Sequence, residues 1–288
     1  MGIDGIRGGL ALLCVAALTG CGGAIGPIDL PDLGAASKDV PLDNYTPEQI
    51  FSRGEYELRE GNAEDAARYF GEVERLYPYS ELAQRAVIMQ AFAFHEADIY
   101  ELSRSSAQRY LDFYPASDDA AYATYLVALS YYDQIGEVGR DQKLTFQALQ
   151  ALRNVIEQYP GTEYARSAKL KFDLAYDHLA SKEMEIGRYY LKRGNDAAAI
   201  NRFRVVVEDF QTSTHTAEAL HRLVEAYLRI GLTNEAQTAG AILGHNFRGS
   251  PYYEESFALL RASGLEPEDK GGSWLSDIYR QVVRGEWL

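Results

Sequence analysis

The residues whose types and spacing allow covalent chemistry stand near the N-terminus, in the run Leu18-Thr19-Gly20-Cys21. They end an apolar stretch from Gly8 to Gly20, which at 13 residues is too short to cross a bilayer as a helix but fits the core of a signal peptide. Two small residues before a cysteine suit a cleavage site whose cysteine receives a diacylglycerol on its thiol and an acyl chain on its amine. We therefore predict a signal peptide over 1–20 and lipidation of Cys21. An ordinary secretory signal with a chance cysteine is the alternative.

The histidines are the other candidates for chemistry, and their spacing favours neither a metal site nor a catalytic site. They form no HExxH pair and have no cysteine companions: His95, His178, His215, His221 and His245. The sequence also contains no G-x-S-x-G turn, no phosphate-binding loop and no dinucleotide fingerprint. We predict a binding scaffold with no catalytic residue, no metal and no cofactor other than the lipid on Cys21.

The overall charge limits the class of partner. The formal net charge is −14, which argues against nucleic acid and against electrostatic adhesion to anionic lipid. The lipid anchor alone is therefore expected to hold the protein at a membrane. Cys14 leaves with the signal peptide and Cys21 carries lipid, so packing must hold the fold together without a disulfide.

The segment after the lipidated cysteine has the composition of a linker. Residues 22–44 show no apolar periodicity and contain Pro27, Pro31 and Pro41. We predict a flexible tether over 21–44, which would reach about 75 Å if fully extended. That reach is enough to lift a folded body clear of a lipid surface.

From Thr46 onward, apolar and small residues recur at helical spacing in units of about 37 residues. Thr46-Pro47-Glu48 is a helix start, with a capping hydroxyl and a proline in the first turn. In the first unit, the small residues Gly54 and Ala66 lie where the two helices cross, and Gly61 makes the turn between them. Phe70 fills the space between the helices, and Pro78 ends the unit. These offsets resemble the tetratricopeptide repeat.

The pattern returns four times with different quality. The second unit ends at Pro115 with Asp98 in place of the turn glycine, and the third ends at Pro160 after a long loop from Glu137 to Gln142. The fourth and fifth have their turn glycines at Gly194 and Gly231. We predict an all-α fold, a solenoid of about five helix-turn-helix repeats over 45–262, in preference to an irregular helical bundle. In the tail, 263–288, we expect a linker and then either a short amphipathic helix from Trp274 or a floppy end.

The first helices of such repeats line the concave side of a superhelix. By repeat phase, four apolar residues face inward and form a stripe suited to a peptide with aromatic anchors: Phe51, Ile88, Phe92 and Leu126. Coverage of this stripe by neighbouring helices is the alternative.

A cluster of basic residues marks the fourth repeat of this acidic chain: Arg188, Lys192, Arg193 and Arg202. We interpret the cluster as a docking surface for an acidic face of a partner. A solvated helix end, where Arg and Lys also favour the helix dipole, is the alternative.

Several short runs carry a closer resemblance. They are Tyr77-Pro78-Tyr79-Ser80, Arg140-Asp141-Gln142, the run from Tyr159 to Ala165, and Glu185-Ile186-Gly187-Arg188-Tyr189-Tyr190 followed by Ala199, Asn201 and Arg202. With the lipidation motif and the five repeats, the chain up to about Ala262 resembles the BamD family, lipoproteins of the machinery that assembles β-barrels in Gram-negative outer membranes. The tail after Gly264 matches no pattern of that family.

The resemblance implies a lipoprotein of the outer membrane that faces the periplasm, and Gly22 is not the aspartate that retains many lipoproteins at the inner membrane. It implies that the C-terminal repeats dock on the periplasmic POTRA domains of the barrel assembly subunit, beside other assembly lipoproteins. It also implies that the N-terminal repeats recognise unfolded outer-membrane proteins. Another periplasmic repeat lipoprotein, such as a pilotin for a secretin or a coordinator of cell-wall synthesis, is the alternative.

Overall fold

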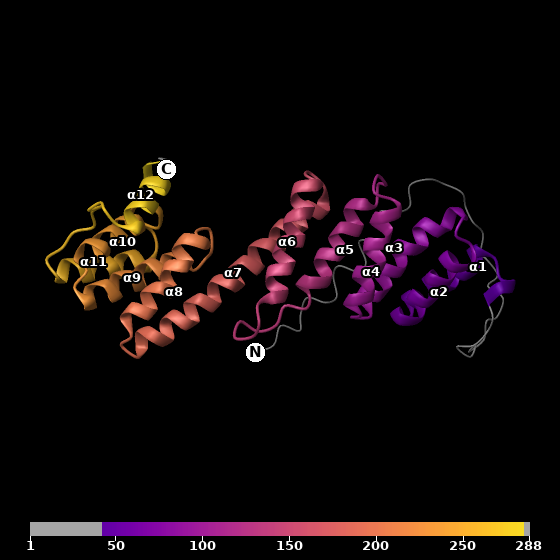
Figure 1. The fold of residues 1–288 in the computed structure, drawn as a ribbon, viewed down its shortest axis with the longest axis horizontal. Coiled ribbons are helices and arrows are strands. Elements are labelled where there is room, and N and C mark those ends of the chain that lie inside the picture. The colour runs from indigo at the N-terminus through magenta and orange to yellow at the C-terminus, as the bar shows by residue number, and fades with distance from the viewer. Residues whose placement is uncertain (1–41, 285–288) are drawn as a thin grey trace.

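The computed structural model describes residues 42–284, with side chains up to residue 281, and every regular element in that part is helical (Figure 1). The predicted signal peptide, Cys21 and the predicted tether up to residue 41 lie outside the described residues, whereas the last three tether residues, 42–44, form a 3-10 helix with Leu42 buried. The elements are the 3-10 helix η1 (Leu42–Asn44) and the helices α1 (Pro47–Arg59), α2 (Ala63–Leu76), α3 (Glu81–Glu96), α4 (Tyr100–Phe113), α5 (Ala120–Tyr132), α6 (Lys143–Gln158), α7 (Glu163–Lys192), α8 (Asp196–Asp209), α9 (Thr216–Ile230), α10 (Thr233–Asn246), α11 (Pro251–Ala262) and α12 (Trp274–Arg284).

The helices stand in a row, from α1 and α2 at one end to α11 and α12 at the other (Figure 1). Each helix from α1 to α10 packs extensively against the next one along the chain, and α1, α3 and α5 also contact one another in sequence. This is the packing of a solenoid, in which each repeat buries its apolar face on its neighbours. The predicted all-α solenoid is confirmed.

The turns between paired helices have the predicted backbone. Gly61, Gly194 and Gly231 adopt φ angles of 83°, 73° and 80°, which only glycine accepts without strain. In the second repeat Asp98 takes the same left-handed conformation at φ 58°, and the Tyr100 hydroxyl donates a hydrogen bond to its carboxylate at 2.7 Å. The turn therefore keeps the left-handed backbone conformation of the other repeats, although an aspartate stands where they have a glycine.

Small residues sit where helices cross, as the repeat pattern predicts. A Cβ atom on Gly54 in α1 would lie 2.8 Å from a ring carbon of Phe70 in α2. Gly187 in α7 faces Phe203 of α8 in the same way and even more tightly. Both phenylalanines are fully buried, so each glycine lets an aromatic ring fill the space between two helices.

Helix α7 departs from the regular repeat. It runs without interruption for 30 residues, beginning after Thr162, whose hydroxyl accepts a hydrogen bond from the Ala165 amide at 3.1 Å. Its first half packs against α5 and α6, and its second half packs against α8. The interval between the third and fourth repeats is therefore one long helix, which crosses diagonally between two groups of helices in Figure 1. We refer to α1–α6 as the N-terminal half and to α8–α12 as the C-terminal half.

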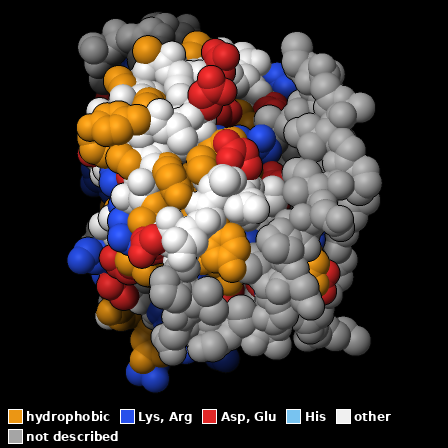
Figure 2. Space-filling view, turned by 90° about the vertical axis from the view of Figure 1, so that its right-hand side faces the viewer, with side chains coloured by type: hydrophobic (Ala, Val, Ile, Leu, Met, Phe, Trp, Pro, Cys, Tyr) orange, Lys and Arg blue, Asp and Glu red, His pale blue; other side chains and the backbone are white. Residues whose placement is uncertain are grey.

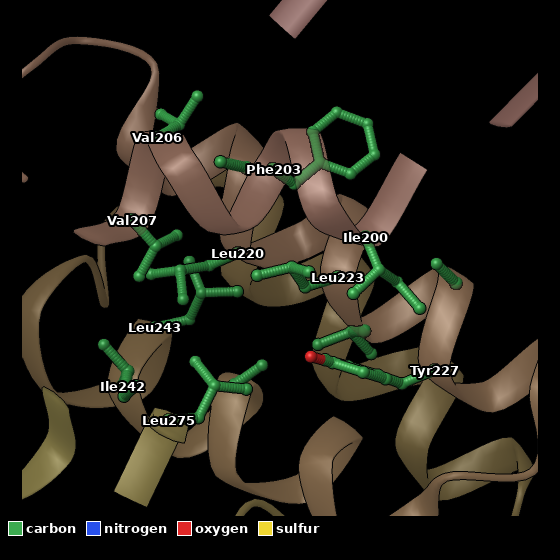
Figure 3. Packing of buried hydrophobic residues seen from close by; sticks show 14 of the residues in the cluster. Ile200, Phe203, Val206, Val207, Leu220, Leu223, Tyr227, Ile242, Leu243 and Leu275 are labelled. Atoms are coloured by element: carbon green, nitrogen blue, oxygen red, sulfur yellow. The ribbon is translucent and has the colours of Figure 1, made fainter. Parts of the chain in front are cut away.

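The C-terminal half has the largest core cluster, in which α8, α9, α10 and α12 meet (Figure 3). Leu275 of α12 is fully buried against this cluster, and the Trp274 indole N–H donates to the Tyr227 hydroxyl at 3.1 Å. The end of the tail therefore forms a helix, α12, and is not a floppy end. The preceding linker is also held, because the Gln237 amide of α10 donates to the Glu266 carbonyl at 2.8 Å.

Candidate interaction surfaces

The predicted apolar stripe is not open in this structure. Phe51, Ile88 and Leu126 are only 4%, 5% and 1% exposed, so the expectation that they line an accessible groove is wrong. Phe92 alone is half-buried and keeps some surface. Neighbouring helices cover the other three side chains, as the alternative interpretation of the stripe expects.

Contacts between successive first helices explain this burial. Ile88 of α3 and Leu126 of α5 belong to one core cluster, because α3 and α5 touch directly. The Phe51 ring lies 5.1 Å from that of Phe70, and the Arg85 guanidinium covers it at 5.0 Å. Repeat phase alone therefore did not show the depth to which the neighbouring helix covers these residues.

Polar pairs connect the first helices of the N-terminal half. Glu55 of α1 and Arg85 of α3 are 3.3 Å apart, and His95 of α3 lies 3.1 Å from Asp133, which follows α5. Each pair joins two successive first helices. Seen from the α1–α2 end, the described surface also mixes hydrophobic, acidic and basic side chains (Figure 2).

The predicted basic cluster is partly neutralised within the protein. Arg188 pairs with Glu218 of α9 at 2.9 Å, and Arg202 pairs with Glu183 of α7 at 3.0 Å. Arg193 and Lys192 are exposed at the end of α7, and the Arg193 guanidinium lies 4.3 Å above the Tyr189 ring. These residues lie around the start of the C-terminal half, as the sequence predicts, but two of the four charges already have partners.

The Arg188 pair belongs to a longer polar network along the C-terminal half. Glu218 also accepts a hydrogen bond from Arg222, and Arg222 pairs with Glu225 at 2.6 Å. His221, which is 3% exposed, lies within 3.9 Å of Glu225 and 3.3 Å of Glu255 in α11. The network thus links α7, α9 and α11 through side chains that repeat phase did not identify.

Comparison with known proteins decides the family. A family model described as "YfiO: Outer membrane lipoprotein" matches residues 43–242, from η1 to α10. A protein of Caulobacter vibrioides called "outer membrane protein assembly factor BamD" is 45% identical over 89% of this chain and 81% of its own length. A protein of Rickettsia prowazekii with the same description is 40% identical over 79% of this chain and 91% of its own length.

The chain belongs to the BamD family. Among solved structures, one titled for Pseudomonas aeruginosa pilF covers 76% of this chain at 18% identity and a TM-score of 0.31. Such a score carries no argument about this chain, so membership of the BamD family rests on sequence.

One motif that carried the resemblance to the BamD family is the loop with Arg140, Asp141 and Gln142, and α7 holds it in place. The Lys182 ammonium donates to the main-chain carbonyls of Gly139 and Arg140 at 3.0 and 2.8 Å. Nδ1 of His178 lies 3.2 Å from Oε1 of Gln142. The Arg140 and Asp141 side chains are thereby presented to solvent from a fixed loop. The sequence contains no signal for this clamp, because its members are about 40 residues apart.

A contact among Ser256, His221 and Glu255 has the residue types of a catalytic triad but not its access. Nδ1 of His221 lies 2.8 Å from the Ser256 hydroxyl oxygen, and Ser256 is completely buried between α9 and α11. A nucleophile must reach a substrate, so this contact is a packing feature of this BamD-family chain. Burial lowers the pKa of His221 below its usual range, while the nearby Glu225 opposes that shift.

No three carboxylate, histidine or cysteine side chains among the described residues come together as a metal site. None of the helices of residues 42–284 has the length and apolarity needed to cross a membrane.

Proposed function

We propose that this chain is a non-catalytic scaffold for the assembly of β-barrel proteins in the outer membrane. The observation that carries the proposal is the identity of 45% over 89% of the chain with an outer membrane protein assembly factor. The family description as an outer membrane lipoprotein supports the location. In this proposal a lipid on Cys21 anchors the chain at the periplasmic face, and the signal peptide 1–20 is removed.

The N-terminal half is proposed to hold unfolded outer-membrane proteins. Support comes from the half-buried Phe92 and from the polar pairs Glu55–Arg85 and His95–Asp133 between the first helices, which offer an aromatic contact and hydrogen-bonding groups to an extended chain. Phe51, Ile88 and Leu126 contribute to this surface only by fixing the spacing of α1, α3 and α5.

The C-terminal half is proposed to dock on the POTRA domains of the barrel assembly subunit. Where α7 meets this half, Lys192 and Arg193 supply unneutralised charge, and Arg188 and Arg202 are oriented by Glu218 and Glu183. Positive groups fixed in this way favour an acidic face of a partner. Other assembly lipoproteins would join the same complex.

Isolation of the protein from gently solubilised envelopes, through a tag at the C-terminus, tests the proposal. Near-equal recovery of an outer-membrane barrel protein that carries periplasmic repeat domains is the expected result. Recovery of a secretin or a cell-wall enzyme in its place would keep the fold and overturn the function.

A further inference from the structure

The first half of α7 is packed on one side only. Its Ala168 and Ala175 are buried against α5 and α6. Helix α8 packs on the second half of α7, and the loop after α8 returns to α7 at Tyr176, whose ring lies 4.9 Å from that of Phe210. Among the described residues, the face of α7 before Tyr176 and opposite these alanines is therefore open.

Two leucines stand one helical turn apart on this face. Leu170 is 68% exposed and Leu174 is 61% exposed, which makes them the two most exposed large aliphatic side chains of the described residues. A single exposed leucine is ordinary, but two adjacent ones form a surface on which another apolar segment can pack. Arg166 stands one turn before Leu170, so these three residues form a line at intervals of about 6 Å. We call this line the open face of α7.

Two basic side chains adjoin the leucines. The Arg166 guanidinium donates one hydrogen bond, to the Gly161 carbonyl at 3.0 Å, and has further N–H donors beyond that one. Lys171 follows Leu170 directly, and its ammonium lies 4.7 Å from the centre of the Tyr132 ring. A partner with an acidic group beside its apolar residues therefore suits the open face of α7.

The acidic residues on the same half of α7 have other roles. Asp173 pairs with Lys169, and Asp177 accepts hydrogen bonds from the main chain and the hydroxyl of Thr214, both at 2.9 Å. Glu163 is in the first turn, where its charge favours the helix dipole. These acids therefore leave the charge of Arg166 available to a partner.

One segment of the chain itself has the complementary sequence. Residues 28–33, Ile-Asp-Leu-Pro-Asp-Leu, combine three large aliphatic residues and two aspartates with no basic residue. They belong to the predicted tether and lie outside the described residues. In an extended chain every second side chain is on the same side, at intervals of about 6.6 Å, so an extended segment would present Ile28, Leu30 and Asp32 in one line.

We propose that residues 28–33 dock in extended form on the open face of α7. With the segment running opposite to α7, three pairs form: Ile28 with Leu174, Leu30 with Leu170, and Asp32 with Arg166. The intervals of about 6 Å on the helix and about 6.6 Å on the extended chain match over these pairs. Each contact is modest, but the two partners are parts of one chain, which gives a high effective concentration.

The length of chain before α1 is sufficient for this contact. Leu42 is buried beside α1 and α2, and the Tyr77 hydroxyl at the α2–α3 turn donates to the Tyr45 carbonyl at 2.6 Å. The α6–α7 turn, just before Arg166, is the equivalent turn two repeats further along the same edge. Two steps of about 10 Å between packed helices, with about 10 Å to cross α7, make about 30 Å. The chain from Asp32 to Leu42 advances ten residues and reaches about 33 Å when extended.

The docked segment would change where the lipid holds the protein. Residues 22–27 alone would then connect Cys21 to the solenoid, a span of about 23 Å. The membrane anchor would thus hold the middle of the solenoid, at α7, and not its α1 end. This consequence rests on the lipid of the proposed function, whereas the contact with α7 does not.

Disulfide formation between paired cysteines tests the contact in the mature chain, residues 21–288, purified with Cys21→Ala and therefore without any other cysteine. Leu30→Cys with Leu170→Cys places two cysteines in the proposed register. The matched control is Leu30→Cys with Phe113→Cys, because Phe113 is 65% exposed at the end of α4, nearer to Leu42 along the same edge. Non-reducing gels after addition of a mild oxidant measure the two rates.

A docked segment and a free tether give opposite orders of rate. A free tether meets position 113 at least as often as position 170, because position 113 is nearer to Leu42. Docking should make the cross-link to position 170 form about fivefold faster or more, since it holds the two cysteines within bonding distance. A cross-link to position 113 that forms as fast as the one to position 170 overturns the proposal, as do covalent dimers as the main product.

Exchange of charge tests the register in the same assay. Asp32→Arg should slow the cross-link to position 170 by about threefold, and the further substitution Arg166→Asp should restore it. Asp39→Arg is the control, because it makes the same change of charge outside the docked segment. Equal rates of the Asp32 and Asp39 variants would contradict the pairing of Asp32 with Arg166.

The contact and the proposed function fail separately. The purified chain carries no lipid and meets no partner in this assay. If the barrel subunit is recovered from envelopes but the cross-link to position 170 is not favoured, only the docking of residues 28–33 is overturned. If a secretin is recovered and the cross-link is favoured, the docking stands and the function does not.

Discussion

A Cβ atom on Gly54 would lie 2.8 Å from Cε1 of Phe70, so these two residues set how closely α1 and α2 approach. Gly54→Ala should therefore lower the free energy of unfolding by about 1–2 kcal/mol, despite the better helix propensity of alanine. Gly139→Ala is the matched control, because a Cβ atom there meets nothing within 4 Å and its φ is not positive. Urea unfolding of the two purified variants measures the difference. Equal midpoints would show that the helices can separate without cost.

His221 gives the fold a predictable response to acid. Burial lowers its pKa below the usual range, so between that value and about 6.5 the unfolded chain binds a proton that the folded chain does not. The stabilising effect of a neutral His221 is present above pH 6.5 and is lost as the pH falls below it, by at most about 1.4 kcal/mol per pH unit. The free energy of unfolding measured from pH 8 to pH 5 should show this slope. His221→Gln should flatten it, and an unchanged slope in that variant would assign the response to other groups.

Phe92 is the predicted substrate-binding residue that retains surface. Phe92→Glu should weaken the binding of C-terminal peptides of barrel proteins by about tenfold, because it replaces an aromatic contact with a charge. Phe113→Glu is the control, since Phe113 is an exposed aromatic at the end of α4. The measurement is peptide affinity, with circular dichroism to check the fold. Unaltered affinity of the Phe92 variant would remove this residue from the binding surface.

Arg202 has an internal partner, so its role in docking needs a variant that preserves the pair. Arg202→Glu should reduce co-purification with the barrel assembly subunit, because it opposes Glu183 and reverses the charge offered to the partner. Combining it with Glu183→Arg restores an ion pair in the opposite direction. If the double variant still fails to co-purify, the partner contacts Arg202 directly. If it recovers, Arg202 acts only on the packing of α7 and α8.

Cys21 carries the proposed membrane attachment. Cys21→Ala should move the protein from the membrane fraction to the soluble fraction, because the chain then has no acyl groups to bury. Cys14→Ala is the control, since it removes a cysteine from the signal peptide and leaves the lipidation motif intact. Fractionation followed by detection of the tag is the measurement. Retention of the Cys21 variant in the membrane fraction would contradict the lipid anchor.

Local features of the repeat could be predicted because they depend on neighbouring residues. The crossing of Gly54 with Phe70, the turn at Gly61 and the capping hydroxyl of Thr46 are all present. Asp98 is instructive, because the repeat pattern required a left-handed residue and the structure has one without a glycine. Aspartate tolerates that conformation better than most side chains, so the turn persists.

Features that depend on distant segments could not be predicted. The burial of Ile88 and Leu126 is set by the distance between α3 and α5, which the period of a single helix does not contain. The same holds for the pairing of Arg188 with Glu218 and of Arg202 with Glu183, since both partners lie on a neighbouring helix. The continuous α7 departs from the regular repeat, which has a turn between successive units, and no proline or glycine stands between Glu163 and Ile186 to end the helix.

The unbroken helix α7 fixes the spacing between the N-terminal half and the C-terminal half. Its 30 residues correspond to about 45 Å of axial length, so α7 sets the distance and the angle between the N-terminal half and the C-terminal half. One residue added to its middle would turn the C-terminal half by about 100° while moving it only about 1.5 Å. The number of residues in α7, more than their identity, therefore determines how the two halves are oriented relative to each other.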